Sequence, residues 1–148
     1  MDFVVTRDRA GAARAYALEI NLRKGGTTLP FQMLQFLTAG TVDARTGEFH
    51  APLGESRCYY ATDNLQKPAY RALTAEDLID ILVNHQLHFD PTRQQGVVFH
   101  LMGALPMYGK LGLVSIAPTH AEAEEQCHRV EALLDAEAAL LPAPRVRR

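Results

Sequence analysis

The sequence lacks the excess of positive charge that a nucleic-acid surface needs. Its 15 lysines and arginines are balanced by 17 aspartates and glutamates, which leaves a net charge of −2. The one basic cluster is C-terminal and comprises Arg145, Arg147 and Arg148. No apolar run approaches the roughly 20 residues that span a bilayer, and no signal-peptide pattern is present. We therefore expect neither a nucleic-acid nor a membrane partner.

Cysteine is also scarce. Cys58 and Cys127 lie far apart, without a CxxC or a Cys/His spacing. Reduced thiols in a cytoplasmic protein are the expected state. His85 and His88 flank the end of an expected helix, where histidines usually interact with the helix dipole, and no third ligand has a fitting spacing for zinc.

The length of 148 residues fits one domain with its own core. Hydrophobic periodicity predicts an α+β fold, in which helices pack on a mostly antiparallel sheet. Expected strands cover 3–6, 16–22, 57–61, 97–102 and 111–116, and expected helices cover 31–39, 74–87 and 119–140. The nearly continuous apolar run 97–102 suits a central strand, with His100 as a hydrogen-bonded core histidine, and 103–110 reads as a loop.

The stretch 18–30 carries the strongest chemical signal. In a strand over 16–22, alternation places Leu18, Ile20 and Leu22 on a buried face. The opposite face then presents Glu19, Asn21 and Arg23. A carboxylate, an amide oxygen and a guanidinium are the groups that a magnesium–phosphate site requires. The simpler alternative is a Gly-Gly turn that follows a strand whose three polar side chains only face solvent.

The segment Lys24-Gly25-Gly26-Thr27-Thr28 follows directly. Thr27 or Thr28 is a reasonable N-cap for a helix that Pro30 enters in its first turn. Because the backbone N–H groups of a helix N-terminus attract anions, this loop is expected to bind phosphate.

Strands 3–6 and 16–22 are expected to form a hairpin with Asp2 opposite Glu19. Two carboxylates and the amide of Asn21 then converge, which is unfavourable unless a cation binds there. The chain begins almost directly in this strand, which predicts partner strands in an upstream sequence or another polypeptide.

Four polar residues gather at the end of the strand 57–61: Tyr59, Tyr60, Asp63 and Asn64. They either contact a substrate or belong to a structured surface loop whose side chains bond their own backbone, and the second reading is the simpler one.

The motif Glu19-x-Asn21-x-Arg23 resembles the metal- and phosphate-binding strand of ATP-grasp ligases, and Asp2-Phe3 resembles the acidic strand before it. The longer strings EINLRKGGTT, YYATDNL and VVFHLMGAL are similar to the C-terminal part of the pheganomycin-type peptide ligases. These enzymes use ATP to join a carboxylate to an amine through an acyl-phosphate.

The resemblance implies that Asp2, Glu19 and Asn21 hold two magnesium ions on the ATP phosphates. Arg23 would be the catalytic residue that faces the transferred phosphate, and the loop 24–28 would bind the cofactor and border the carboxylate substrate. Catalysis of this kind depends on metal ions that hold the ATP phosphates and on residues that position the reacting groups.

The chain departs from the family at two points. Leu29 stands where the family tends to carry a histidine, so no imidazole role is expected there. The lysine-bearing nucleotide-binding subdomain, which lies upstream in these enzymes, is not recognised here, so the chain alone is not expected to hold ATP tightly. The chain then reads as a fragment, a split-gene product, the product of a mis-assigned start, or a remnant.

By this resemblance, residues 1–40 end the ATP-grasp catalytic region, 41–141 form a C-terminal α+β region of the same domain, and 142–148 are a flexible basic tail. Two functions follow. One is the C-terminal part of a carboxylate–amine ligase that needs its upstream half, and the other is a non-catalytic interaction or regulatory domain derived from such a ligase.

Overall fold

The computed structural model describes residues 2–20, 22–52 and 54–142 and has the expected α+β architecture. Within these residues the strands form three separate antiparallel sheets, ordered β1-β2, β3-β4 and β5-β7-β6. The strands are β1 (Asp2–Arg7), β2 (Ala13–Glu19), β3 (Thr41–Val42), β4 (Phe49–His50), β5 (Cys58–Gln66), β6 (Gly96–His100) and β7 (Lys110–Ala117). The α-helices are α1 (Thr28–Thr38), α2 (Ala75–Asn84), α3 (Leu105–Tyr108) and α4 (His120–Leu140), and the 3-10 helices are η1 (Pro68–Ala72) and η2 (Met102–Ala104).

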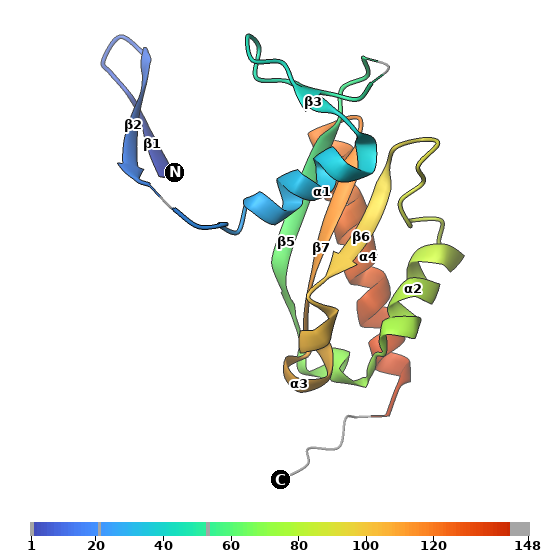
Figure 1. The fold of residues 1–148 in the computed structure, drawn as a ribbon. Coiled ribbons are helices and arrows are strands. Elements are labelled where there is room, and N and C mark those ends of the chain that lie inside the picture. The colour runs from blue at the N-terminus through green and yellow to red at the C-terminus, as the bar shows by residue number, and fades with distance from the viewer. Residues whose placement is uncertain (1, 21, 53, 143–148) are drawn as a thin grey trace.

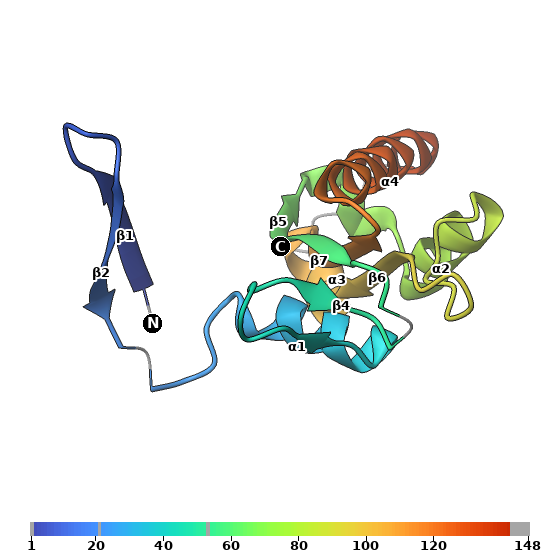
Figure 2. The same ribbon diagram turned by 90° about the horizontal axis from the view of Figure 1, so that it is seen from above.

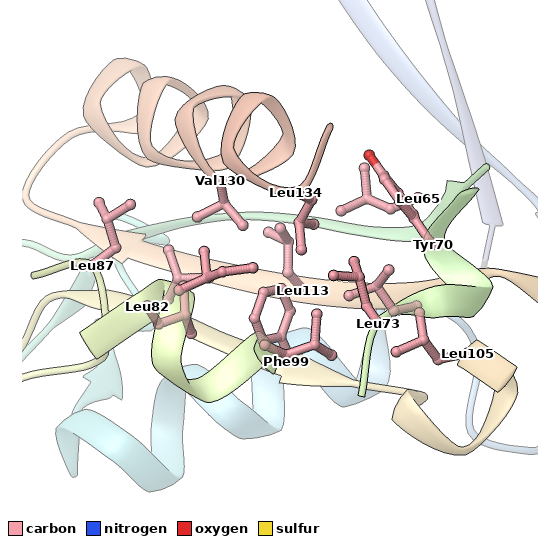
Figure 3. Close-up of a cluster of buried hydrophobic side chains, with 14 of the residues drawn as sticks. Leu65, Tyr70, Leu73, Leu82, Leu87, Phe99, Leu105, Leu113, Val130 and Leu134 are labelled. Atoms are coloured by element: carbon pink, nitrogen blue, oxygen red, sulfur yellow. The ribbon is translucent and has the colours of Figure 1, made fainter. Parts of the chain in front are cut away.

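Helices cover both faces of the three-stranded sheet, with α4 and α2 on one side and α1 on the other (Figures 1 and 2). Alternation along β7 divides its side chains between two core clusters. Leu111 and Leu113 belong to the larger cluster, under α2 and α4 (Figure 3). Val114 and Ile116 belong to the smaller one, which includes Leu34 of α1.

Two helices begin at the residues that their local sequence predicts, because each starts with a capping box. The Thr74 hydroxyl accepts from the N–H of Asp77, whose carboxylate accepts from the N–H of Thr74. Thr119 and Glu122 make the same reciprocal pair at the start of α4. Each box satisfies two backbone donors that the helix cannot bond internally.

The prediction of the central strand was wrong. β7 lies between β5 and β6, whereas β6 is at an edge. Both segments are apolar, and the long-range pairing that separates them is not readable from local composition. The expected loop 103–110 instead contains most of η2 and the short helix α3, with Pro106 in the first turn of α3, where it needs no backbone donor.

Helix ends also differ from expectation. α1 ends at Thr38 rather than at residue 39, and Ala39 is its left-handed cap residue. Gly40, which follows, has no room for a side chain, because a Cβ there would overlap the Phe49 ring and the His50 carbonyl. α2 ends at Asn84 rather than near residue 87, and His85, its C-cap residue, is exposed.

On α4 the last buried position is Ala138, and Leu141 lies beyond the helix and is exposed. Cys58 and Cys127 are both free thiols, as expected.

The hairpin β1–β2 stands apart from the remaining elements (Figures 1 and 2). All of its residues are exposed, including large apolar side chains such as Phe3 (58%), Val5 (64%) and Leu18 (68%). The expectation that Leu18, Ile20 and Leu22 form a buried face was therefore wrong, since no other described element packs against them.

Candidate functional site

The hairpin brings two predicted metal-binding residues together. Asp2 and Glu19 are cross-strand partners, as the sequence predicts. Partners directly opposite each other project from the same face of an antiparallel pair, so two exposed carboxylates share one patch. The register shifts between Asp2 and Phe3, which marks a bulge beside this pair. Asn21, the third predicted ligand, lies outside the described residues.

The expected strand does not continue to Leu22, because β2 ends at Glu19. Among the described residues, the pairing of β1 with β2 runs from Arg7 and Ala13 to Asp2 and Glu19. Arg23 therefore lies in an exposed bend rather than on the face of a strand. Simple alternation does not place Arg23 beside Glu19.

The predicted phosphate loop folds onto the start of α1. The Gly25 N–H donates to the Thr28 hydroxyl at 3.0 Å, and the Thr28 N–H donates to the Gly25 carbonyl at 3.1 Å. Thr27 is the N-cap, but its side chain makes no capping hydrogen bond. Pro30 is buried in the first turn, as expected. Lys24 and Gly26 are exposed.

A cleft of about 690 Å³ lies between this loop and β5. It is lined by residues of the loop and α1, of β5, of β6 and of the start of α4: Gly26, Thr27, Pro30, Tyr59, Tyr60, Ala61, Thr62, Asp63, His100 and His120. The cleft thus joins the loop to Tyr59, Tyr60 and Asp63, three of the four residues for which substrate contact was one of two readings. Asn64, the fourth, does not line the cleft.

β5 is longer than the predicted strand 57–61. It runs to Gln66 with a register shift between Thr62 and Leu65, and the Asn64 N–H donates to the Thr62 hydroxyl at 3.1 Å. Bulges redirect side chains and are common beside functional sites. The segment is therefore a strand rather than a loop, although the Thr62 hydroxyl bonds the backbone as the simpler reading expects.

The environment of His100 also differs from expectation. Both ring nitrogens are buried, and neither has a hydrogen-bond partner among the described residues. Burial lowers the pKa of His100, while the nearby Asp63 carboxylate and the main chain of Thr62 act in the opposite direction. The imidazole is therefore neutral at pH 7.

Sequence reasoning did not connect two residues with this cleft. The sequence predicts a core position for His100 and no role for His120. Tyr60 contacts the His120 ring edge-on, with centroids 5.9 Å apart. Only the pairing of distant strands and the start of α4 bring these rings together, so no local signal identifies them.

A second cleft, of about 570 Å³, lies at the end of α2 and contains His85 and His88 together with Arg93 and Arg129. His85 is the C-cap of α2, and both histidines are exposed. In the described part of the chain, no group of three or more His, Cys, Asp or Glu side chains is placed to hold a metal ion. Likewise, none of the described helices is long and apolar enough to cross a membrane.

The sequence model of the PGM1 C-terminal domain family matches residues 77–130, which are 54 of the 148 residues. This match confirms the resemblance to the C-terminal domain of pheganomycin-type ligases in this part of the chain. It covers most of α2, all of β6 and β7, and the first half of α4. Comparisons with curated proteins and with solved structures found no significant match.

Proposed function

We propose that this chain, whose residues 77–130 match the PGM1 C-terminal domain family, is the C-terminal part of an ATP-dependent carboxylate–amine (peptide) ligase of the ATP-grasp type. The observation that carries the proposal is the pairing of Asp2 with Glu19 across the hairpin. Two carboxylates on the same face of an antiparallel pair offer oxygen ligands of the kind that suit magnesium.

The chain's own residues would divide the work between metal binding and positioning. Asp2 and Glu19, with Asn21, would hold magnesium on the nucleotide phosphates. Arg23 would contribute a cation for phosphate oxygens, and the loop 24–28 would border the phosphates and the carboxylate substrate. Bound magnesium–ATP supplies the phosphoryl group that activates the carboxylate.

The exposed hairpin supports a further part of the proposal. Phe3, Val5 and Leu18 each expose more than half of their surface. A two-stranded hairpin with an uncovered apolar surface is only marginally stable in water. We propose that an ATP-grasp half, in the same or another chain, covers it and supplies the rest of the nucleotide site.

Calorimetric titration of the full chain with magnesium and a non-hydrolysable ATP analogue tests the proposal. We expect weak but saturable binding that requires magnesium and is lost in Glu19→Ala. Glu125→Ala, which removes an exposed carboxylate from α4, should bind as the wild type does. Equal binding by the wild type and Glu19→Ala, or no binding by a chain that circular dichroism shows to be folded, would remove the metal-binding role from this chain.

The position of the family match favours a second candidate, a non-catalytic interaction or regulatory domain derived from such a ligase. The matched residues 77–130 include neither the carboxylate pair nor Arg23. This candidate predicts that the chain binds an ATP-grasp partner without nucleotide and that Glu19→Gln leaves that binding and the partner's activity unchanged. Loss of ligation in the Glu19→Gln complex would reject it.

A further inference from the structure

His100 is half-buried, and its two buried ring nitrogens lack the partners that buried polar atoms normally have. Neither ring nitrogen is hydrogen-bonded within the described residues, although His100 lines the 690 Å³ cleft. Buried polar side chains without a partner are rare in folded proteins, and each calls for an explanation such as a bound ligand. Because His100 is neutral at pH 7, one of its nitrogens is an unprotonated acceptor.

Charge in the cleft has one sign. Asp63 contributes a carboxylate, and none of the described lining residues is a lysine or an arginine. Tyr59 and Tyr60 contribute aromatic walls from successive positions of β5. A carboxylate, a neutral imidazole and aromatic rings together favour a ligand with a cationic or donor group, and they disfavour an anion.

The cleft also lies where a second substrate is needed. It shares Gly26 and Thr27 with the loop that is expected to border the activated carboxylate. An amine must reach that carboxylate directly to form an amide, so its binding site has to adjoin this loop.

We propose that this cleft binds the amine acceptor of the ligation reaction, with Asp63 as the counter-charge of the amine, His100 as its hydrogen-bond acceptor, and Tyr59 and Tyr60 as the walls around it. The inference rests on the proposed function, since it assigns the second substrate of the same reaction. It identifies the ligand as a primary amine, such as the N-terminus of a peptide.

Nuclear magnetic resonance of the full chain, without nucleotide or magnesium, tests the inference. The probes are glycylglycinamide, which has a free amine, and N-acetyl-glycylglycinamide, which has none. We expect saturable shifts of the His100 imidazole and of the Tyr59–Asp63 amides with the first probe only. Asp63→Asn should weaken this binding about tenfold, as expected for the loss of a charge-assisted hydrogen bond.

Asp80→Asn is the matched control, because Asp80 is an exposed carboxylate on α2 outside this cleft, and it should bind as the wild type does. His100→Gln, which replaces the imidazole with a polar amide, should also weaken binding. Equal shifts with the acetylated probe, or unchanged affinity in Asp63→Asn, would overturn the proposal. No shift at His100 with either probe would also overturn it.

The result separates this inference from the proposed function. Glycylglycinamide binding is measured without nucleotide, whereas the magnesium–nucleotide titration depends on Glu19. Amine binding without Glu19-dependent nucleotide binding would support the cleft and reject the metal site. Glu19-dependent nucleotide binding without amine binding would reject only the proposed amine site.

Discussion

The imidazole of His100 lies over the α-carbon of Gly112, its cross-strand partner on β7. A Cβ at position 112 would overlap three atoms of the ring. The absence of a side chain on the central strand is therefore what allows His100 to lie across the sheet toward Thr62 and Asp63 on β5.

Gly112→Ala should push the imidazole out of this position. Overpacking of a buried site costs about 1–3 kcal/mol, so we expect a loss of that size in the free energy of unfolding, measured with urea. Gly103→Ala is the matched control, because a Cβ there meets nothing within 4 Å, and it should change stability by less than about 0.5 kcal/mol.

Adding His100→Ala to Gly112→Ala should recover most of the loss, since the overlapping ring is removed. If the two substitutions are simply additive, the contact between His100 and Gly112 does not limit stability.

Arg57→Lys should destabilise the chain by about 1–3 kcal/mol in urea unfolding. The Arg57 guanidinium is almost fully buried and donates to the carbonyls of Ser56 (2.8 Å), Gln94 (3.0 Å) and Arg93 (3.2 Å). An ammonium cannot reach these diverging acceptors together. Arg45→Lys, at an exposed position, should have almost no effect, and an equal loss in both variants would contradict this account.

Asp135 should contribute stability that acid removes. Its carboxylate accepts from the Lys67 ammonium at 2.7 Å and from the Tyr70 hydroxyl at 2.7 Å. The ammonium, and to a lesser extent the hydroxyl, hold the pKa of Asp135 below its ordinary value of 3.8. Because the folded pKa is depressed, the contribution is complete above pH 3.8 and is lost as the pH falls below it.

The measurement is the stability of the wild type and of Asp135→Asn between about pH 6 and pH 2. The wild type should lose more stability over this range, and added salt should reduce the difference, since both charged groups are partly exposed. Parallel curves for the two proteins would show that the ion pair contributes nothing.

Amide hydrogen exchange should show strong protection in one part of the chain and weak protection in another. β7 is buried from Leu111 to Ala117 and should exchange only by global unfolding, whereas the exposed hairpin β1–β2 should exchange through local opening at a much lower cost. Strong protection of residues 2–19 in the isolated chain would mean that something already covers the hairpin, and sedimentation would then identify a second copy.

The two thiols should differ in reactivity. Burial, followed by the charges of Glu131 and Glu124, raises the pKa of the Cys127 thiol to about 11, so very little reactive thiolate is present at pH 8. Cys58 is half-buried on β5. Iodoacetamide at pH 8 should modify Cys58 first and Cys127 only on unfolding, and rapid labelling of folded Cys58→Ser would contradict this expectation.

The sequence predicted features that depend on neighbouring residues. The capping boxes at Thr74 and Thr119 are local hydrogen-bond patterns, and the pairing of Asp2 with Glu19 follows from a hairpin centred on one loop. The order of β6 and β7 depends on long-range pairing, and so does the cleft in which His100 meets Asp63. The face formed by Leu18 and Ile20 was mispredicted because alternation identifies an apolar face without saying what covers it.

The position of β7 has a consequence for how the chain is made. β7 joins β5 to β6 yet follows both of them in the sequence. During synthesis, neither earlier strand can find its place in the three-stranded sheet until residues 110–117 have left the ribosome. The apolar side chains of β5, α2 and β6 therefore stay exposed to solvent until β7 is synthesised and completes the sheet.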